Sequence, residues 1–385
     1  MATDWYPSDW KPTKLSELGK LDRGRSRHRP RYAPHLYGGS YPFIQTGDIK
    51  ASGGKITSYT QTYSEAGLAQ SRLWQAGTLC ITIAANIAET GILTFPACFP
   101  DSVVGFIADE TKCDIYFVEY MFRYLRSRIQ HEATGSVQDN INLATLNRLE
   151  FPTPPLPEQR AIAGILGALD DKIELNRRMN RTLESMARAV FRQWFVEGED
   201  VGDWEVGTLG DVIVNFDSKR VPLSKREREQ RQGQYPYYGA ASIMDYVDDY
   251  LFDGIYVLMA EDGSVVGNED HPVLQYVWGK FWVNNHAHVL QGTNGICNEH
   301  LYLFLKDVNI LPYVTGAVQP KLNQANMNSI PFVIPPKELS KKFEEFVSPL
   351  FAKIRANEEE SRTLASLRDS LLPKLMKGEV RVRGL

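Results

Sequence analysis

The sequence predicts an α+β protein built as a tandem duplication, in which two mixed globular domains alternate with two long helices. Two observations lead to this fold class. Short motifs recur along the chain at fixed offsets, and each copy ends in a heptad pattern of apolar residues. The length of 385 residues agrees with this, because it exceeds one ordinary core and indicates two or three domains.

The internal repeat is defined by two offsets. Asp9-Trp10 recurs as Asp203-Trp204, 194 positions later, and Thr134–Gln138 recurs as Thr315–Gln319, 181 positions later. The second offset then holds without a gap for about fifty residues, up to Leu364. The second copy is therefore 13 residues shorter in its middle. The two copies are alike at their ends and differ between them.

A long helix is predicted at the end of each copy. In the first copy, residues 158 to 195 follow a proline-rich start and contain no proline themselves. The second copy repeats the pattern but contains Pro349, where we expect a kink. One heptad position forms a seam whose residues are Ile162, Leu169, Asn176 and Leu183 in the first copy and Phe343, Leu350, Asn357 and Leu364 in the second.

The two seams are expected to pack on each other as an antiparallel coiled-coil spacer. A helix this long cannot bury its stripe alone, and the matching stripe lies in the other copy. Asn176 and Asn357 at equivalent seam positions would set the register. The alternative is that each helix packs only on its own globular domain. The expected domains are residues 1–152 (first globular domain), 153–200 (first helix), 201–333 (second globular domain) and 334–385 (second helix).

Both globular parts carry a basic cluster at the same place, between the Trp and the Tyr-Pro motif of their copy. The candidate DNA contacts are Arg23, Arg25, Arg27, Arg29 and Arg31 in the first copy and Lys219, Arg220, Arg226 and Arg228 in the second. Basic side chains gain by neutralising phosphates, and arginine can also bind guanine through two hydrogen bonds. The net charge of −4 does not itself indicate a nucleic-acid partner, so this local concentration carries the inference. A solvated loop is the alternative.

A Gly-x-x-Gln segment precedes each long helix. Its candidate DNA-binding residues are Gly135, Ser136 and Gln138 in the first copy and Gly316 and Gln319, with the neighbouring Lys321, in the second. Glycine allows a close backbone approach, and a glutamine amide can pair with an adenine edge or a phosphate. A structural turn with a capping amide explains the segment equally well.

No catalytic or metal-binding motif accompanies these segments. The sequence lacks a phosphate-binding GxxxxGK[ST] loop, a glycine-rich methyl-donor motif and an Asn-Pro-Pro-Tyr type motif. His286, His288, Cys297 and His300 could supply metal ligands, but their spacing matches no zinc pattern and no metal site is predicted. The apolar runs are shorter than the roughly 18 residues of a membrane span, and four dispersed cysteines suit a cytoplasm.

Several segments resemble the specificity subunits of Type I restriction-modification systems, and the resemblance covers nearly the whole chain. The segments that carry it are Pro154–Ile162 with its helix, Leu367–Glu379, Tyr41–Ile44 with Gly47–Ile49, and Trp282–Val289. The second copy departs from the pattern at Pro336–Leu339, where the Pro-Glu-Gln opening is missing.

The resemblance implies a non-catalytic subunit with two target-recognition domains, each recognising one half of a split, asymmetric site in double-stranded DNA. It implies two methyltransferase subunits that use S-adenosylmethionine, and restriction and translocase subunits that use ATP and magnesium, in a bacterial or archaeal cytoplasm. This chain itself would bind no cofactor.

Two other classes of protein remain open on the residues alone. A stand-alone DNA-binding regulator would bind one sequence without partners. A self-contained nuclease or methyltransferase would show turnover, and the missing motifs argue against it.

Overall fold

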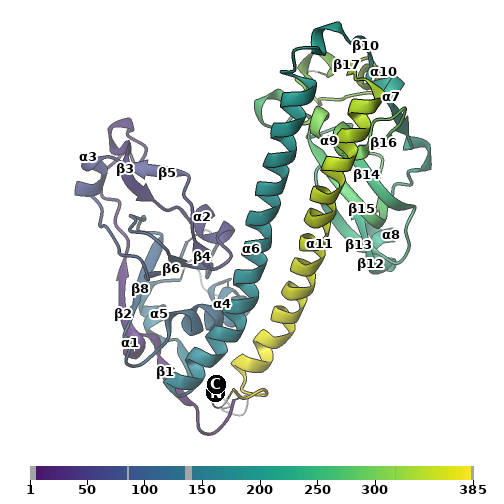
Figure 1. The fold of residues 1–385 in the computed structure, drawn as a ribbon. Helices are drawn as coiled ribbons and strands as arrows, with labels where there is room; N and C mark the ends of the chain where they lie inside the picture. Colours follow the sequence, from purple (N-terminus) through teal and green to yellow (C-terminus); the bar gives the residue numbers. More distant parts are fainter. Residues whose placement is uncertain (1–5, 85, 135–140, 317, 383–385) are drawn as a thin grey trace. The chain divides into compact units, whose positions relative to one another are not determined.

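The structure is a computed structural model that describes residues 6–84, 86–134, 141–316 and 318–382. The chain divides into two compact units. Unit 1 comprises residues 1–174 and 361–385, and unit 2 comprises residues 175–360. The two longest helices, α6 (Leu156–Phe195) and α11 (Lys337–Met376), each contribute one part to each unit (Figure 1).

Unit 1 is organised around a five-stranded sheet. Its spatial order is β2 (Gly19–Arg23), β8 (Val103–Ala108), β6 (Leu79–Thr82), β7 (Thr90–Leu93) and β4 (Lys55–Ile56). All pairs are antiparallel except β4 with β7. A separate pair joins β3 (Tyr37–Phe43) to β5 (Gln61–Tyr63). The shorter helices are α1 (Leu15–Leu18), α2 (Thr46–Ala51), α3 (Glu65–Ala69), α4 (Ile115–Thr134) and α5 (Leu143–Arg148).

The main core of unit 1 lies between this sheet and the helices α4 and α6. Leu79 and Phe106 from the sheet belong to the same buried cluster as Phe122 of α4 and Ile162 of α6. Both central strands β6 and β7 are buried along their whole length, so the continuous apolar run at residues 79–83 reflects burial on both faces.

Unit 2 is organised around a six-stranded sheet. Its spatial order is β11 (Ile213–Asn215), β16 (Ala287–Gly292), β14 (Phe252–Ala260), β15 (Leu274–Val283), β12 (Gln232–Tyr238) and β13 (Ile243–Val247). Only β12 and β15 pair in parallel. The shorter helices are α7 (Leu209–Val212), α8 (Lys225–Gln230), α9 (Asn298–Leu305) and α10 (Gln324–Asn328). The core between this sheet and α9 contains Val257, Leu290 and Leu301.

The repeat seen in the sequence appears in the structure as equivalent elements. Strand β1 (Lys11–Lys14) pairs with β9 (Glu150–Thr153), and strand β10 (Glu205–Thr208) pairs with β17 (Pro331–Ile334) in the corresponding register. The helices α6 and α11 begin and end at positions that differ by 181, and both have 40 residues. Asn142 and Asn323 each cap the short helix that follows. The ends of the copies are therefore equivalent, whereas their central sheets differ.

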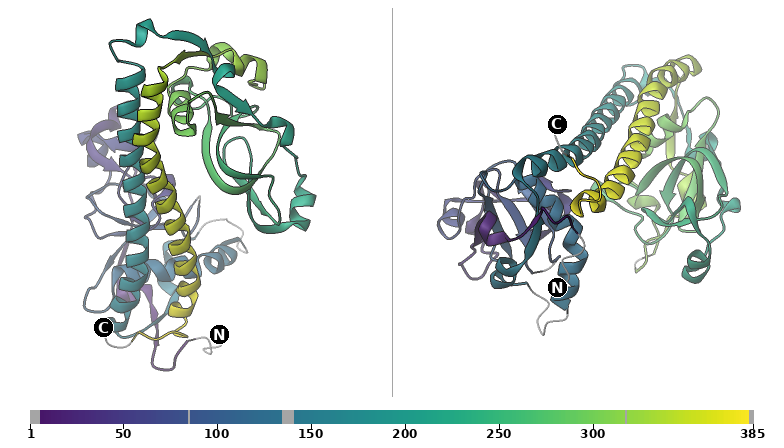
Figure 2. Two further views of the ribbon diagram at one scale, coloured as in Figure 1. Left: turned by 45° about the vertical axis from the view of Figure 1, so that its right-hand side comes forward. Right: turned by 90° about the horizontal axis from the view of Figure 1, so that it is seen from below.

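The long helices run antiparallel (Figure 2). In unit 1, Asp170 of α6 accepts a hydrogen bond from Arg368 of α11, and in unit 2 Asn180 of α6 donates one to the carbonyl of Ile354. Residue numbers rise along α6 as those of its partners fall along α11.

The predicted α+β architecture with two tandem domains and two long antiparallel helices is confirmed. Each helix also packs on its own globular domain, but not exclusively, because the two helices contact each other as well.

Helix α11 continues through Pro349, where the sequence indicated an interruption. Proline removes one backbone hydrogen bond, but its ring lies on the exposed side of α11. The neighbouring Val347 and Phe351 are buried, and their packing holds the helix together across the missing bond.

Among the described residues, no helix is long and apolar enough to cross a membrane.

Candidate nucleic-acid interface

The basic segment of unit 1 forms a row of exposed arginines. Strand β2 ends at Arg23, and the following backbone stays attached to the protein through hydrogen bonds from the Gly24 amide to Val103 and from the Arg25 amide to Phe99. Gly24 and Ser26 are buried, whereas the flanking Arg23, Arg25 and Arg27 are exposed. Extended backbone alternates its side chains between two faces, so this pattern places these three arginines on one side.

Acidic neighbours divide this row into two parts. The guanidinium of Arg31 donates two hydrogen bonds to Asp101, at 2.8 and 2.9 Å, and Arg29 lies 4.0 Å from the same carboxylate. Within the described part of the chain, no carboxylate lies within 4.0 Å of the guanidinium groups of Arg23, Arg25 and Arg27. These three are the side chains of the row that are available to a phosphate.

A further arginine beside the row was not singled out in the sequence. The Arg72 guanidinium stacks over the Trp74 ring at 3.9 Å and binds Asp22 at 2.5 Å. The neighbouring Ser71 donates a hydrogen bond to the Arg25 carbonyl. These residues lie about 50 positions apart along the chain, so only the folded structure brings them together.

The basic segment of unit 2 is largely neutralised by the protein itself. Arg228 is a half-buried residue that pairs with Asp245 at 3.2 Å and donates to the Leu223 carbonyl. Exposed Lys219 lies over the Phe216 ring at 5.1 Å, and exposed Arg226 has no carboxylate within 4.0 Å among the described residues. Lys219 and Arg226 are therefore the predicted basic contacts of this segment that remain available.

The second Gly-x-x-Gln segment forms a closed turn. The backbones of Thr315 and Lys321 exchange two hydrogen bonds, of 2.8 and 2.7 Å. Gly316 has a φ of +90°, and a Cβ there would lie 2.3 Å from the Gln319 carbonyl oxygen, so the position requires glycine. Gln319 is exposed, and Lys321 lies 3.4 Å from Glu261. The equivalent residues Gly135, Ser136 and Gln138 lie outside the described residues.

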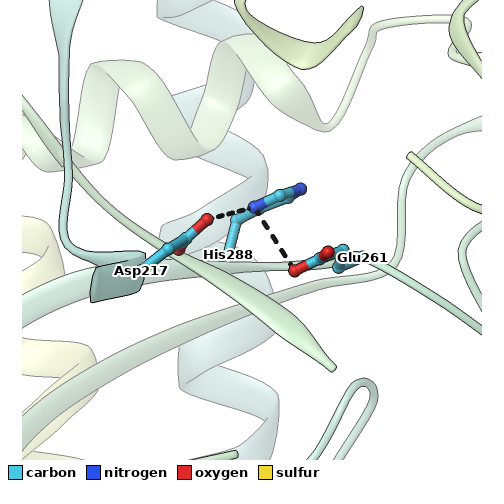
Figure 3. Close-up of side chains that lie close together, drawn as sticks. All are labelled: Asp217, Glu261 and His288. Carbon is cyan, nitrogen blue, oxygen red and sulfur yellow. Dashed lines mark hydrogen bonds and ion pairs between the residues drawn. The ribbon is translucent and has the colours of Figure 1, made fainter. Parts of the chain in front are cut away.

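A buried charge cluster links these segments of unit 2 (Figure 3). His288 of β16 is 1% exposed, and its Nδ1 lies 2.6 Å from Asp217 and 3.9 Å from Glu261. Its Nε2 lies 2.8 Å from the Leu322 carbonyl oxygen. Arg220, predicted as a DNA contact, instead donates to Glu261 at 2.7 Å and approaches Asp217 at 3.5 Å. Asp217 was not identified from the sequence.

The cluster is better described as an ion-pair network than as a metal site. Asp217, Glu261 and His288 form the one group of three or more metal-ligand side chains found among the described residues. Arg220 already pairs with both carboxylates, and both ring nitrogens of His288 face protein oxygens. Burial acts to raise the pKa of the Asp217 carboxyl, but the hydrogen bond and charge of His288 outweigh it and lower that pKa.

The histidines and the cysteine that suggested metal ligands do not form a group of metal-ligand atoms among the described residues. Exposed His286 pairs with Asp262 at 2.6 Å. Cys297 caps helix α9, and burial raises the pKa of its thiol to about 12. His300 of α9 packs against Phe195 and Phe343, with ring centres 4.4 and 5.5 Å away.

The seam residues occupy both buried and half-buried positions. Ile162, Asn176, Phe343 and Asn357 are buried, and Leu169, Leu183, Leu350 and Leu364 are half-buried. In unit 2, the Asn176 amide donates to Glu360 at 2.8 Å and to the Asn357 carbonyl at 3.3 Å. The Asn357 amide donates to Asn180 at 2.8 Å. The two seam asparagines thus make polar contacts between the helices.

Comparison with known proteins identifies the family. The family described as "Type I restriction modification DNA specificity domain" matches residues 7–185 and 202–365. The chain belongs to this family. The two matched regions correspond to the two copies found in the sequence, and the resemblance stated there is confirmed.

Specificity subunits of distant organisms align with nearly the whole chain. The MjaIX specificity subunit of Methanocaldococcus jannaschii is 25% identical over 426 residues, covering 98% of this chain and 95% of that protein. The EcoprrI specificity subunit of Escherichia coli is 22% identical over 347 residues, covering 86% and 84%. A solved S subunit from M. genitalium shares the fold, with a TM-score of 0.61 at 20% identity over 95% of this chain and 96% of that one.

Both repeats of this Type I specificity subunit carry exposed cations in the described part of the chain. The exposed cations of unit 1 stand on a rigid extended segment, and those of unit 2 stand beside a buried ion-pair network. Sequence patterns identified these segments because each contains a local excess of basic residues. The partners that orient them, Asp101, Asp217 and Glu261, belong to no recognisable motif.

Proposed function

We propose that this Type I specificity subunit recognises a bipartite, asymmetric sequence in double-stranded DNA, with one half-site assigned to each repeat. The observation that carries the proposal is the combination of equivalent ends and different middles. The β1–β9 and β10–β17 pairs correspond in register, but the sheet between them has five strands in the first repeat and six in the second. Two repeats with equivalent ends and different central sheets can each recognise a different half-site.

The exposed arginines supply the sequence-independent part of binding. Arg23, Arg25 and Arg27 project from a segment whose backbone is fixed by hydrogen bonds to Val103 and Phe99. Fixed cations neutralise DNA phosphates and release counterions, which favours binding even though the chain as a whole is acidic. Phosphate contacts of this kind set the orientation of a protein on DNA, and groove contacts then select the bases.

We infer that the two helices also present docking positions for two copies of one methyltransferase subunit. Met186 of α6 and Leu367 of α11 occupy equivalent repeat positions, and both are exposed, at 48% and 45%. A partner that covered these side chains would remove their apolar surface from water, which favours association. Because the two positions are related by the internal repeat, the same partner surface can use both. Restriction subunits would join through this assembly, and the length of the helices would set the spacing of the half-sites.

Sequencing of methylated DNA tests the proposal. The gene and its neighbouring methyltransferase gene are expressed in a host that lacks other methyltransferases. We expect a split, asymmetric methylated motif that disappears when this gene is deleted. A motif that persists without the gene, or the absence of any motif together with tight DNA binding by the isolated chain, would support a stand-alone regulator instead.

A further inference from the structure

One buried imidazole holds both candidate DNA-contact segments of the second repeat. We propose that His288 is a positioning residue that sets recognition of the half-site assigned to this repeat. It fixes the segment 217–220, which carries Lys219, and the turn 315–322, which carries Gly316, Gln319 and Lys321. This inference rests on the proposed function, because it assigns the two segments to DNA.

The first segment is attached to β16 through three residues of that strand. The Asp217 carboxylate lies 2.6 Å from His288 Nδ1 and accepts a hydrogen bond of 2.9 Å from the Val289 amide. Arg220, at the other end of the segment, donates at 2.7 Å to the Ala287 carbonyl. Lys219 lies between these two attachments, so its backbone is fixed on both sides while its side chain remains exposed.

The second segment is attached at its final residue. The Leu322 amide donates to the Glu261 carbonyl at 2.8 Å, and the Leu322 carbonyl faces His288 Nε2 at 2.8 Å. The Leu322 side chain is fully buried, which adds an apolar anchor. The closed turn between Thr315 and Lys321 is thereby joined directly to the sheet. Loss of the His288 contact would free one side of this attachment while the Glu261 contact remained.

Both ring nitrogens of His288 face acceptor oxygens, those of the Asp217 carboxylate and the Leu322 carbonyl. The carboxylates of the cluster also have basic partners, since Arg220 pairs with Asp217 and Glu261, and Lys321 pairs with Glu261. Nearly complete burial of the ring excludes water from these contacts, so a substitution cannot be compensated easily by solvent.

The first repeat fixes its arginine row by a different means. There the Gly24 and Arg25 amides donate to backbone carbonyls of Val103 and Phe99. No buried histidine of the described part of unit 1 takes part in this attachment. A change at His288 should therefore act on one repeat alone.

Two isosteric substitutions separate the two attachments. The amide nitrogen of asparagine lies near the place of Nδ1, and that of glutamine near the place of Nε2. His288→Asn should keep the contact with Asp217 and lose the contact with Leu322, and His288→Gln should do the reverse. Both variants remove the same imidazole ring, so a difference between them reports the attachments. His271→Asn, in the same unit but outside the cluster, is the matched control.

Hydrogen exchange and methylation are measured on the complete complex with its methyltransferase subunits. We expect His288→Asn to accelerate exchange in residues 315–322 and His288→Gln to accelerate it in 217–220. Both should lower discrimination against single-base changes about tenfold in one half-site, with the other half-site and the control unchanged. Unchanged exchange in both segments, or equal loss at both half-sites, would overturn the proposal. If the wild-type complex shows no sequence preference, the proposed function fails, and exchange still decides whether His288 is the anchor.

Discussion

At the scale of single residues, Gly24 determines whether the arginine row of unit 1 can form. A Cβ at this position would lie 2.2 Å from the Pro100 carbonyl oxygen and 2.5 Å from the Phe99 ring. The close approach lets the backbone of Gly24 and Arg25 bind the loop beside β8, and this contact directs Arg23 and Arg25 outward. The availability of these guanidinium groups for phosphate thus depends on a neighbour that has no side chain.

Removing one available arginine should weaken DNA binding in a salt-dependent way. We expect Arg25→Ala to lower the affinity for all DNA sequences and to reduce the slope of log K against log salt by about 1. Arg31→Ala should change the slope less, because Asp101 already neutralises Arg31. Titrations of the complete complex at several salt concentrations measure both slopes. Equal slopes for wild type and Arg25→Ala would show that Arg25 does not contact a phosphate.

At the scale of elements, Asp170 of α6 joins three helices within unit 1. Its carboxylate accepts hydrogen bonds from Tyr120 and Arg123 of α4, at 2.7 and 3.0 Å, and from Arg368 of α11, at 2.6 Å. Burial acts to raise the pKa of Asp170, but Arg123 and Arg368 outweigh it and lower that pKa. The carboxylate therefore stabilises the fold in its ionised form.

Asp170→Asn should destabilise unit 1 by on the order of 1–2 kcal/mol at neutral pH, because it removes the charge that Arg123 and Arg368 share, although Glu119 and Asp369 still pair with them. A lowered pKa in the folded state means that the stabilisation is present above the ordinary carboxyl pKa of about 4 and is lost as the pH falls below it. The difference between variant and wild type should therefore shrink in acid. Chemical denaturation at pH 7 and at about pH 2.5 measures it, and a constant difference would contradict the assignment.

His300 makes the packing of α9 on α6 and α11 sensitive to acid. Burial among Phe195, Phe343 and their neighbours lowers the pKa of its imidazole to about 3. Between this value and the ordinary pKa of about 6.5, the unfolded chain binds a proton that the folded chain does not. We expect the free energy of unfolding to fall by about 1.4 kcal/mol per pH unit on acidification in this range. His300→Leu should remove that contribution from denaturation curves at pH 7.5, 6.5 and 5.5.

At the scale of the whole molecule, the sequence predicted what depends on local or repeated patterns. The heptad stripe and the repeat offset located α6 and α11, because an amphipathic helix is encoded within a few turns. The basic segments were also found, because a local excess of Lys and Arg is visible in the sequence without the fold. The partners of these segments were not found, since Asp217 lies 71 positions from His288 and Arg31 lies 70 from Asp101. Arg220 was therefore predicted as a DNA contact, and its pairing with Glu261 in unit 2 could not be predicted.

Exchange of residues 20–150 should change the half-site assigned to the first repeat and leave the other half-site unchanged. Residues 20–150 are replaced by those of another specificity subunit, which retains β1, most of β9 and all of α6. The core clusters of the first repeat, around Phe106 and around Trp74, share no residue with the cluster around Val257 in the second, so the exchange leaves the second core intact. We expect the methylated motif to keep one half and its spacing while the other half is replaced. An unchanged motif, or one altered in both halves, would show that the repeats do not recognise DNA independently.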